Sequence, residues 1–128
     1  MAATPVHTLA NESYVNLATF RRSGAAVETP VWFAALDDKL YVVTDGTTAK
    51  VKRLRATTRI RVAACNVRGG IHGAWHDGSG RIVRDPKLVE AAHAALQEKY
   101  GWQMWLLDTG SRLFGRFGRR VYLELTLS

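Results

Sequence analysis

The chain has 128 residues, which predicts a single domain, 1–128, large enough to bury a hydrophobic core. Its 47% hydrophobic and 23% charged residues are typical of a soluble globular protein, and no apolar run approaches the roughly 20 residues of a membrane-spanning helix. The N-terminus lacks the pattern of a signal peptide, and the single Cys65 excludes an intramolecular disulfide, so a cytoplasmic location is expected. The net charge of +7 indicates an anionic partner: nucleic acid, an acidic membrane surface or an anionic cofactor.

The first half of the chain predicts three consecutive antiparallel strands after a tail or short helix at the N-terminus. Apolar and polar residues alternate over residues 14–21, 26–36 and 39–44, which gives the three strands. Ser23-Gly24 and Asp37-Asp38 supply the turns between them. Pro30 cannot donate a ladder hydrogen bond, so the second strand lies at a sheet edge or contains a bulge.

A basic segment follows the third strand. The Asp45-Gly46 turn, with Thr47 or Thr48 as N-cap, predicts a short helix over Ala49–Ala56. The helix contains no acid, and its cations are Lys50, Lys52, Arg53 and Arg55. Cations in a first helical turn oppose the helix dipole, and each costs roughly 0.3–1 kcal/mol. An external anion would offset that cost.

Two of these cations are well placed for a phosphate. Lys50 and Arg53 lie three residues apart, so they share one helix face, and helical side chains lean toward the N-terminus. There they converge with free backbone N–H groups and threonine hydroxyls, a combination that binds phosphate. The alternative is a solvated basic helix, which is what most charge runs are. The segment lacks Walker-type glycine spacing, which excludes a P-loop.

The second half predicts two further strands, one long helix, a less regular helix over 103–117 and a closing strand over 121–127. The first strand is Arg59–Cys65, and the second is a strand-like segment, 71–83, interrupted by Asp-Gly-Ser-Gly at 77–80. Local chemistry predicts a hairpin turn at that interruption, with a bulged continuous strand as the alternative. The long helix begins at Asp85-Pro86 and ends at Gly101. Five or six antiparallel strands with a few helices give a mainly β (α+β) fold, a small antiparallel barrel.

Several segments resemble a known superfamily. The stretches ATFRRSGAAVETPVWFAALDDKLYVVT, AKVKRLR and RIRVAACNVRGG resemble the pyridoxamine 5′-phosphate oxidase-like split β-barrel proteins. The segment ending in KYGWQ is similar to the actinobacterial branch of flavin- and deazaflavin-dependent oxidoreductases that use coenzyme F420. The resemblance extends from about residue 14 to residue 125, and its most specific parts are TPVWFA, AKVKRLR and EKYGW.

This resemblance implies an FMN-binding-like split β-barrel that forms a homodimer, with one cofactor at each side of the subunit interface. It places the flavin-like ring against the strand around residues 29–32 and the phosphate at the turn and helix over residues 47–53. The implied cofactor-binding residues are Thr29, Pro30, Val31, Trp32, Thr44, Thr47, Thr48, Ala49, Lys50 and Arg53. The family's fifth strand usually continues where this chain has Asp-Gly-Ser-Gly, so a looser loop is expected there.

No set of side chains is typical of a catalytic or metal centre, so no catalytic residue is assigned. His72 and His76 would share one face of an uninterrupted strand, but no third ligand is near them in the sequence. A cofactor enzyme fits this pattern, because the cofactor carries the hydride while the protein supplies orientation and electrostatics. Coenzyme F420 also has a polyglutamate tail, so the excess of Lys and Arg favours F420 over FMN.

The leading hypothesis is an oxidoreductase that transfers hydride from reduced F420 to an unsaturated or quinone-like organic small molecule. An FMN-binding oxidase or reductase of the same fold is the first alternative. A non-catalytic basic binding module is the second, but nucleic acid is not expected as a partner because no recognition motif is present. The basic and apolar residues 104–120 suggest peripheral membrane association, which is compatible with catalysis.

Overall fold

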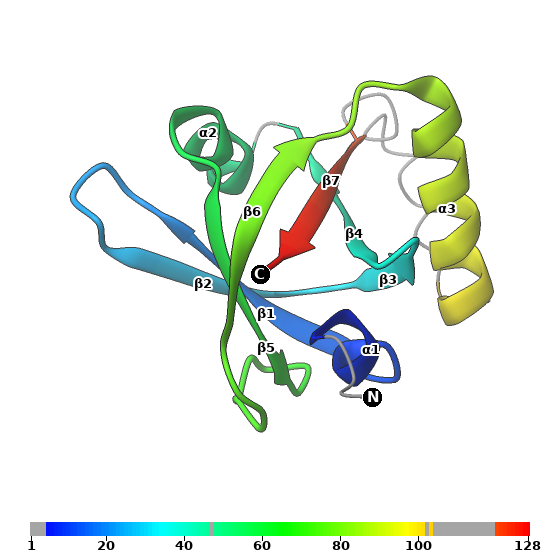
Figure 1. The fold of residues 1–128 in the computed structure, drawn as a ribbon, viewed down its shortest axis with the longest axis horizontal. Helices are drawn as coiled ribbons and strands as arrows, with labels where there is room; N and C mark the ends of the chain where they lie inside the picture. Colours follow the sequence, from blue (N-terminus) through cyan, green and yellow to red (C-terminus); the bar gives the residue numbers. More distant parts are fainter. Residues whose placement is uncertain (1–4, 47, 102, 104–119) are drawn as a thin grey trace.

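A computed structural model describes residues 5–46, 48–101, 103 and 120–128 and contains one seven-stranded antiparallel sheet. Its strands are β1 (Tyr14–Phe20), β2 (Ala26–Val31), β3 (Phe33–Leu36), β4 (Lys39–Asp45), β5 (Arg59–Cys65), β6 (His76–Ile82) and β7 (Arg120–Leu127). Its helices are α1 (Pro5–Leu9), α2 (Ala49–Ala56) and α3 (Pro86–Tyr100). The spatial order is β2-β1-β5-β6-β7-β4-β3, so consecutive strands β2 and β3 form opposite edges and the sheet curls around on itself (Figure 1). The mainly β, antiparallel split-barrel fold predicted from the sequence is confirmed.

The segment expected as one strand over 26–36 is in fact two strands separated at Trp32. β2 pairs with β1, and β3 pairs with β4 instead. The last residue of α3, Tyr100, stabilises the break: its hydroxyl accepts a hydrogen bond from the Phe33 N–H at 3.0 Å and lies 2.9 Å from the Ser13 carbonyl oxygen. The Tyr100 ring also stacks on Trp32, with 4.4 Å between ring centroids. A contact far along the chain therefore sets a strand boundary that local alternation did not reveal.

The two faces of the sheet bury different cores. The inner core lies inside the curled sheet, where the described strands and α2 contribute Val15, Leu17, Val31, Phe33, Leu40, Val42, Leu54, Ile60, Val62, Leu123 and Leu125, among others. The outer core lies between α3 and β3, β4 and β7, and includes Ala34, Tyr41, Ala92, Leu96, Tyr100 and Tyr122. Figure 1 shows α3 along one side of the sheet and α2 at a separate position near the ends of β5 and β6. The two helices therefore leave different parts of the sheet accessible.

The hairpin predicted at residues 77–80 is wrong, and so is the looser loop. β6 runs without interruption through these residues, pairing with β5 on one side and β7 on the other. Gly78 and Gly80 are needed for close packing: a Cβ on Gly78 would meet the Thr126 carbonyl oxygen, and one on Gly80 would lie 3.1 Å from Leu125 Cδ2. The glycines thus let β7 and the inner core approach the strand closely. Glycine is also common in turns, so the local sequence alone does not show which of the two roles it has here.

The helix predictions are confirmed where the structure describes them. α2 occupies Ala49–Ala56 as predicted, and the Asp85 side chain accepts a hydrogen bond from the Lys87 N–H at 3.0 Å as the N-cap of α3. Gly101 follows α3 with a positive φ of 57°. The helix predicted over residues 103–117 lies almost wholly outside the described residues. No helix in the described ranges has both the length and the apolar character needed to cross a membrane.

A buried carboxylate on β7 links three strands of the sheet. Glu124 is 4% exposed and accepts hydrogen bonds from Arg81 Nε at 2.8 Å, from the Tyr41 hydroxyl at 2.8 Å and from Lys39 Nζ at 3.4 Å. Burial alone would raise the pKa of Glu124, but hydrogen bonds from Arg81 and Tyr41, together with nearby positive charges, lower it below its usual range. The ionised form is therefore the form that the fold stabilises.

This lowered pKa predicts acid sensitivity. The unfolded chain binds a proton at this position near the ordinary glutamate pKa of about 4.3, while the folded chain resists protonation. The free energy of unfolding should therefore fall as the pH drops below about 5. Glu124→Gln should reduce stability at pH 7 by about 1–3 kcal/mol and flatten this acid dependence. Urea unfolding between pH 3 and pH 7 tests this, with the exposed Glu90→Gln as control; equal pH profiles for the two variants would contradict it.

Candidate cofactor site

The N-terminus of α2 is formed by a short turn from the end of β4. Thr48 is the N-cap residue and has extended backbone angles, φ −70° and ψ 156°, but its side chain makes no capping hydrogen bond to the helix. The first turn contains no acid, so neither a side-chain cap nor a carboxylate balances the positive end of the helix dipole. Val51 and Leu54 are buried and anchor the helix to the rest of the fold. The exposed end of α2 is thus suited to an anion.

Lys50 and Arg53 differ from the other cations of the helix. Both are partly buried, whereas Lys52 and Arg55 are exposed. Arg53 Nη1 donates a hydrogen bond to Oγ1 of the fully buried Thr19 on β1, at 3.2 Å. Desolvation by burial and then the nearby charge of Arg53 lower the pKa of Lys50. Two partly desolvated cations are therefore held close together.

Neither Lys50 nor Arg53 takes part in any of the ion pairs found within the described residues. Adjacent, partly buried cations repel each other more strongly than cations in water, and a carboxylate partner would normally accompany them. Solvation accounts for Lys52 and Arg55, but it does not explain why the fold shields Lys50 and Arg53. An external anion bound here would offset this repulsion.

The four residues predicted to contact a flavin-like ring are the last three of β2 and Trp32 just after it, and they lie on opposite faces of the sheet. Thr29 pairs with Leu17 and Val31 with Val15, so their side chains point toward the inner core. Pro30 pairs with Asn16 and is exposed on the outer face, where Trp32 stacks on Tyr100. A ligand on the outer face could thus contact the side chains of Pro30 and Trp32, but only the backbone of Thr29 and Val31.

Two polar atoms beside this strand are buried without a hydrogen-bond partner in the described structure. One is Thr29 Oγ1 and the other is Asn16 Oδ1, although Asn16 Nδ2 donates to the Gly69 carbonyl oxygen at 3.1 Å. Buried polar atoms without partners are rare in folded proteins and often mark a place where a ligand or water supplies the missing bond. Asn16 Oδ1 lies on the same outer face as Pro30, whereas Thr29 Oγ1 faces the inner core.

Strand pairing links Arg53 to the inner face of β2, whereas the side chain of Pro30 lies on the outer face. Arg53 contacts Thr19, which pairs with Val27, and Thr29 is the next residue on that face of β2. Thr44, at the end of β4, leads into the α2 turn and is partly buried, as Thr48 is, while Ala49 is exposed. Thr47 lies outside the described residues. The assignment of these residues to a cofactor stays a prediction.

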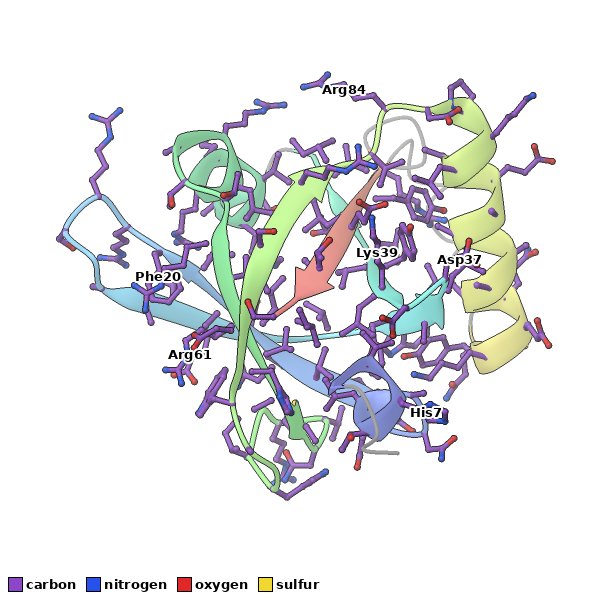
Figure 2. The ribbon with its side chains drawn as sticks, in the orientation of Figure 1. His7, Phe20, Asp37, Lys39, Arg61 and Arg84 are labelled. Carbon is purple, nitrogen blue, oxygen red and sulfur yellow. The ribbon has the colours of Figure 1, made fainter. Side chains whose placement is uncertain are left out.

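A hollow at the C-terminal end of α2 adds positive charge that the sequence analysis did not assign. It has a volume of about 330 Å³, and its lining residues are Phe20, Arg21, Arg22, Gly24, Ala56, Thr57 and Arg59. Among the described residues that line it there are three arginines and no acid. The Arg59 guanidinium lies 4.1 Å from the centroid of the Phe20 ring. Phe20 lies on the side of the molecule away from α3 (Figure 2). Arg21 and Arg22, which are adjacent and directly precede the Ser23-Gly24 turn, are the sequence feature from which this basic surface could have been predicted.

The structure also places His72, His76 and Cys65, which the sequence analysis singled out. Only His76 lies in β6; His72 precedes it, and its Nε2 lies 3.0 Å from Glu12 Oε2. The expected shared strand face is therefore wrong, because the strand begins at His76. Cys65 is buried, and burial followed by the charge of Glu12 raises the pKa of its thiol. No group of three or more metal-ligating side chains occurs in the part of the chain that the structure describes.

Comparison with known proteins identifies the family of this chain. The sequence profile described as pyridoxamine 5′-phosphate oxidase matches residues 6–127. No curated protein matches the chain.

Solved structures extend the comparison to the fold. A conserved hypothetical protein from Mycobacterium tuberculosis is 17% identical with a TM-score of 0.72, over 99% of this chain and 82% of that one. HutZ, the heme storage protein from Vibrio cholerae, is 14% identical with a TM-score of 0.70, over 92% of this chain and 83% of that one. An F420 reductase is 14% identical with a TM-score of 0.63, over 99% of this chain and 96% of that one. These identities are low, so the structural likeness concerns the fold.

Proposed function

Because this chain belongs to the pyridoxamine 5′-phosphate oxidase family, we propose that it is an oxidoreductase that uses coenzyme F420. It would transfer hydride to an unsaturated or quinone-like organic molecule. The observation that carries the proposal is the pair Lys50 and Arg53, which are partly buried and form no ion pair within the described residues. The similarity in fold to an F420 reductase supports it.

The residues present fit the phosphate of such a cofactor. Lys50 supplies a point charge, Arg53 a guanidinium fixed by Thr19, and the first turn of α2 its backbone N–H groups. Thr48 extends the same turn. A phosphate bound there would neutralise both cations and the positive end of the helix dipole at once.

The outer face of β2 would orient the ring. The exposed Pro30 and the stacked Trp32 offer a flat apolar surface, and the unpartnered Asn16 Oδ1 beside Pro30 can accept a hydrogen bond from a ring N–H. The bound deazaflavin would supply the hydride chemistry. The protein would fix which ring face meets the substrate, which is how orientation contributes to rate.

The arginine hollow favours F420 over FMN. α2 has eight residues and is therefore about 12 Å long, so Arg59 and the hollow lie about one helix length from Lys50. We propose that the carboxylates of the polyglutamate tail of F420 bind there. FMN has no such tail and would leave these arginines unused. FMN is nevertheless the alternative cofactor, because the phosphate subsite alone does not distinguish the two.

Turnover with a quinone tests the proposed function. Reduced F420 and menadione are mixed with the purified protein, and F420 absorbance is followed over time. Protein-dependent reappearance of oxidised F420, above the rate without protein, is expected. If that activity is absent and FMN is identified by mass among the molecules released on denaturation, the cofactor is FMN and the F420 proposal is wrong.

We further propose that the chain is a homodimer, because the family resemblance puts one cofactor at each side of a subunit interface. Sedimentation velocity at micromolar concentration should then show a single species of about twice the 14.2 kDa chain mass. A stable, folded monomer at that concentration would contradict the proposal.

A further inference from the structure

Lys99, in the last turn of α3, has an unusual environment for an ammonium group. Its Nζ is buried and has no hydrogen-bond partner in the described structure. Two aromatic rings lie near it: Nζ is 3.4 Å from the centroid of the Phe33 ring and 5.4 Å from that of Tyr100. A buried lysine amine normally hydrogen-bonds or pairs with a carboxylate, because leaving it unpaired is costly. The fold therefore tolerates at this position an amine that is not committed to a polar partner.

The same side chain borders a hollow between α1, β3 and α3. The hollow has a volume of about 450 Å³, and its lining residues are Ala10, Ala34, Ala35, Leu36, Ala95, Glu98 and Lys99. A second hollow of about 240 Å³ shares Ala10, Ala35 and Leu36 with it and extends to His7 and Asp37, which lie toward the α3 side of the molecule (Figure 2). Small apolar side chains form most of the lining, and a volume of this size admits a small organic ligand.

Burial also changes the protonation of the amine. Desolvation lowers the pKa of Lys99 to about 8, against a smaller opposing effect of Glu12. Only the neutral amine has the lone pair that attacks a carbonyl carbon. A lysine with this pKa has about one tenth of its molecules neutral at pH 7, far more than an ordinary lysine with a pKa near 10.4.

We propose that Lys99 is a reactive amine that binds a small, uncharged, apolar aldehyde from this hollow as an imine. The Nζ lone pair attacks the aldehyde carbon, and the carbonyl π electrons move to oxygen, which takes a proton from nitrogen. The resulting carbinolamine loses water as the C=N bond forms, so no oxidant or reductant is needed. The flexible lysine stem lets Nζ turn from the Phe33 ring into the hollow that its own side chain lines.

The residues that line the hollow favour an apolar, uncharged ligand. The alanines and Leu36 favour an apolar body, while Glu98 in the lining and Asp37 in the adjoining hollow repel anionic carbonyl compounds. This inference involves neither Lys50 nor the F420 phosphate. It can therefore fail or succeed independently of the proposed oxidoreductase activity.

Reductive trapping with benzaldehyde tests the proposal. The protein is incubated at pH 7 with benzaldehyde and sodium cyanoborohydride, which reduces the imine to a stable benzyl amine, and labelled lysines are located by peptide mass. Lys99 should be labelled at least roughly tenfold faster than Lys87, the exposed lysine at the start of the same helix. The preference should disappear in urea, where both lysines are solvated.

Two variants distinguish the site from general lysine reactivity. Lys99→Arg keeps the charge but cannot form an imine, so it should remove the fast-labelled site, whereas Lys87→Arg should leave that site intact. A protein in which Lys99 is labelled no faster than Lys87, or in which the Lys99 preference persists in urea, would overturn the proposal.

Discussion

Replacing Lys50 with alanine should weaken F420 binding roughly ten- to a hundredfold, because one charge-assisted hydrogen bond to a phosphate is typically worth ~1.5–3 kcal/mol. Folding should hardly change. The substitution removes a cation from the unfavourable end of the helix dipole. It also removes the desolvation of that amine and its repulsion by Arg53, which in that order lower the pKa of Lys50. Tryptophan fluorescence titration measures the affinity, and thermal melting of the cofactor-free protein measures the stability.

Lys52→Ala is the matched control, since Lys52 lies in the same helix turn but is exposed. It should reduce affinity only slightly, by an amount that moderate salt screens away. The Lys50 effect should largely persist in salt because that amine is partly buried. Equal F420 affinities for the two variants would show that the phosphate does not bind at this helix.

Gly78→Val should destabilise the fold by about 3 kcal/mol or more, because the new side chain would meet the backbone of Thr126 and Leu127 on β7. Backbone atoms cannot move aside as a flexible side chain can. Ser79→Val is the matched control: it is the next residue of β6, it is exposed, and valine suits a strand. Urea unfolding of both variants measures the difference. A Gly78→Val protein as stable as Ser79→Val would mean that β6 is not packed against β7 in this way.

Local patterns predicted the elements whose ends depend on nearby residues. The bounds of α2 and β5 agree with the prediction, as does the start of α3, where the Asp85 cap and Pro86 act on their immediate neighbours. The Asp37-Asp38 turn is also confirmed, and both residues have positive φ values, 52° and 62°, as a tight hairpin turn requires.

The errors arose where distant residues decide the structure. The break at Trp32 depends on Tyr100, 67 positions from the Phe33 backbone that it bonds. Gly78 and Ser79 are residue types common in turns, so local chemistry predicted a turn. The strand that they pack against, β7, comes about fifty residues later, near the end of the chain, and a local pattern does not reveal it. Both cases show tertiary contacts overriding local propensity.

The candidate site could be predicted only in part. Charge and helix capping alone pointed to Lys50 and Arg53, and the structure adds their partial burial and the Thr19 contact. The alternation of β2 was visible in the sequence, yet which face is accessible follows from the pairing with β1. The buried, unpartnered Lys99 gave no sequence signal, because its environment combines residues from β3 and α3.

The measurement that tests the central claim most directly is a parallel titration of the wild-type protein with F420 and with FMN, followed by tryptophan fluorescence. The proposed phosphate subsite at Lys50 and Arg53 and the arginine hollow at the other end of α2 together predict tighter binding of F420. That preference should narrow as salt is added, since the exposed arginines act through screened charge. FMN affinity equal to or greater than that of F420 would contradict the account.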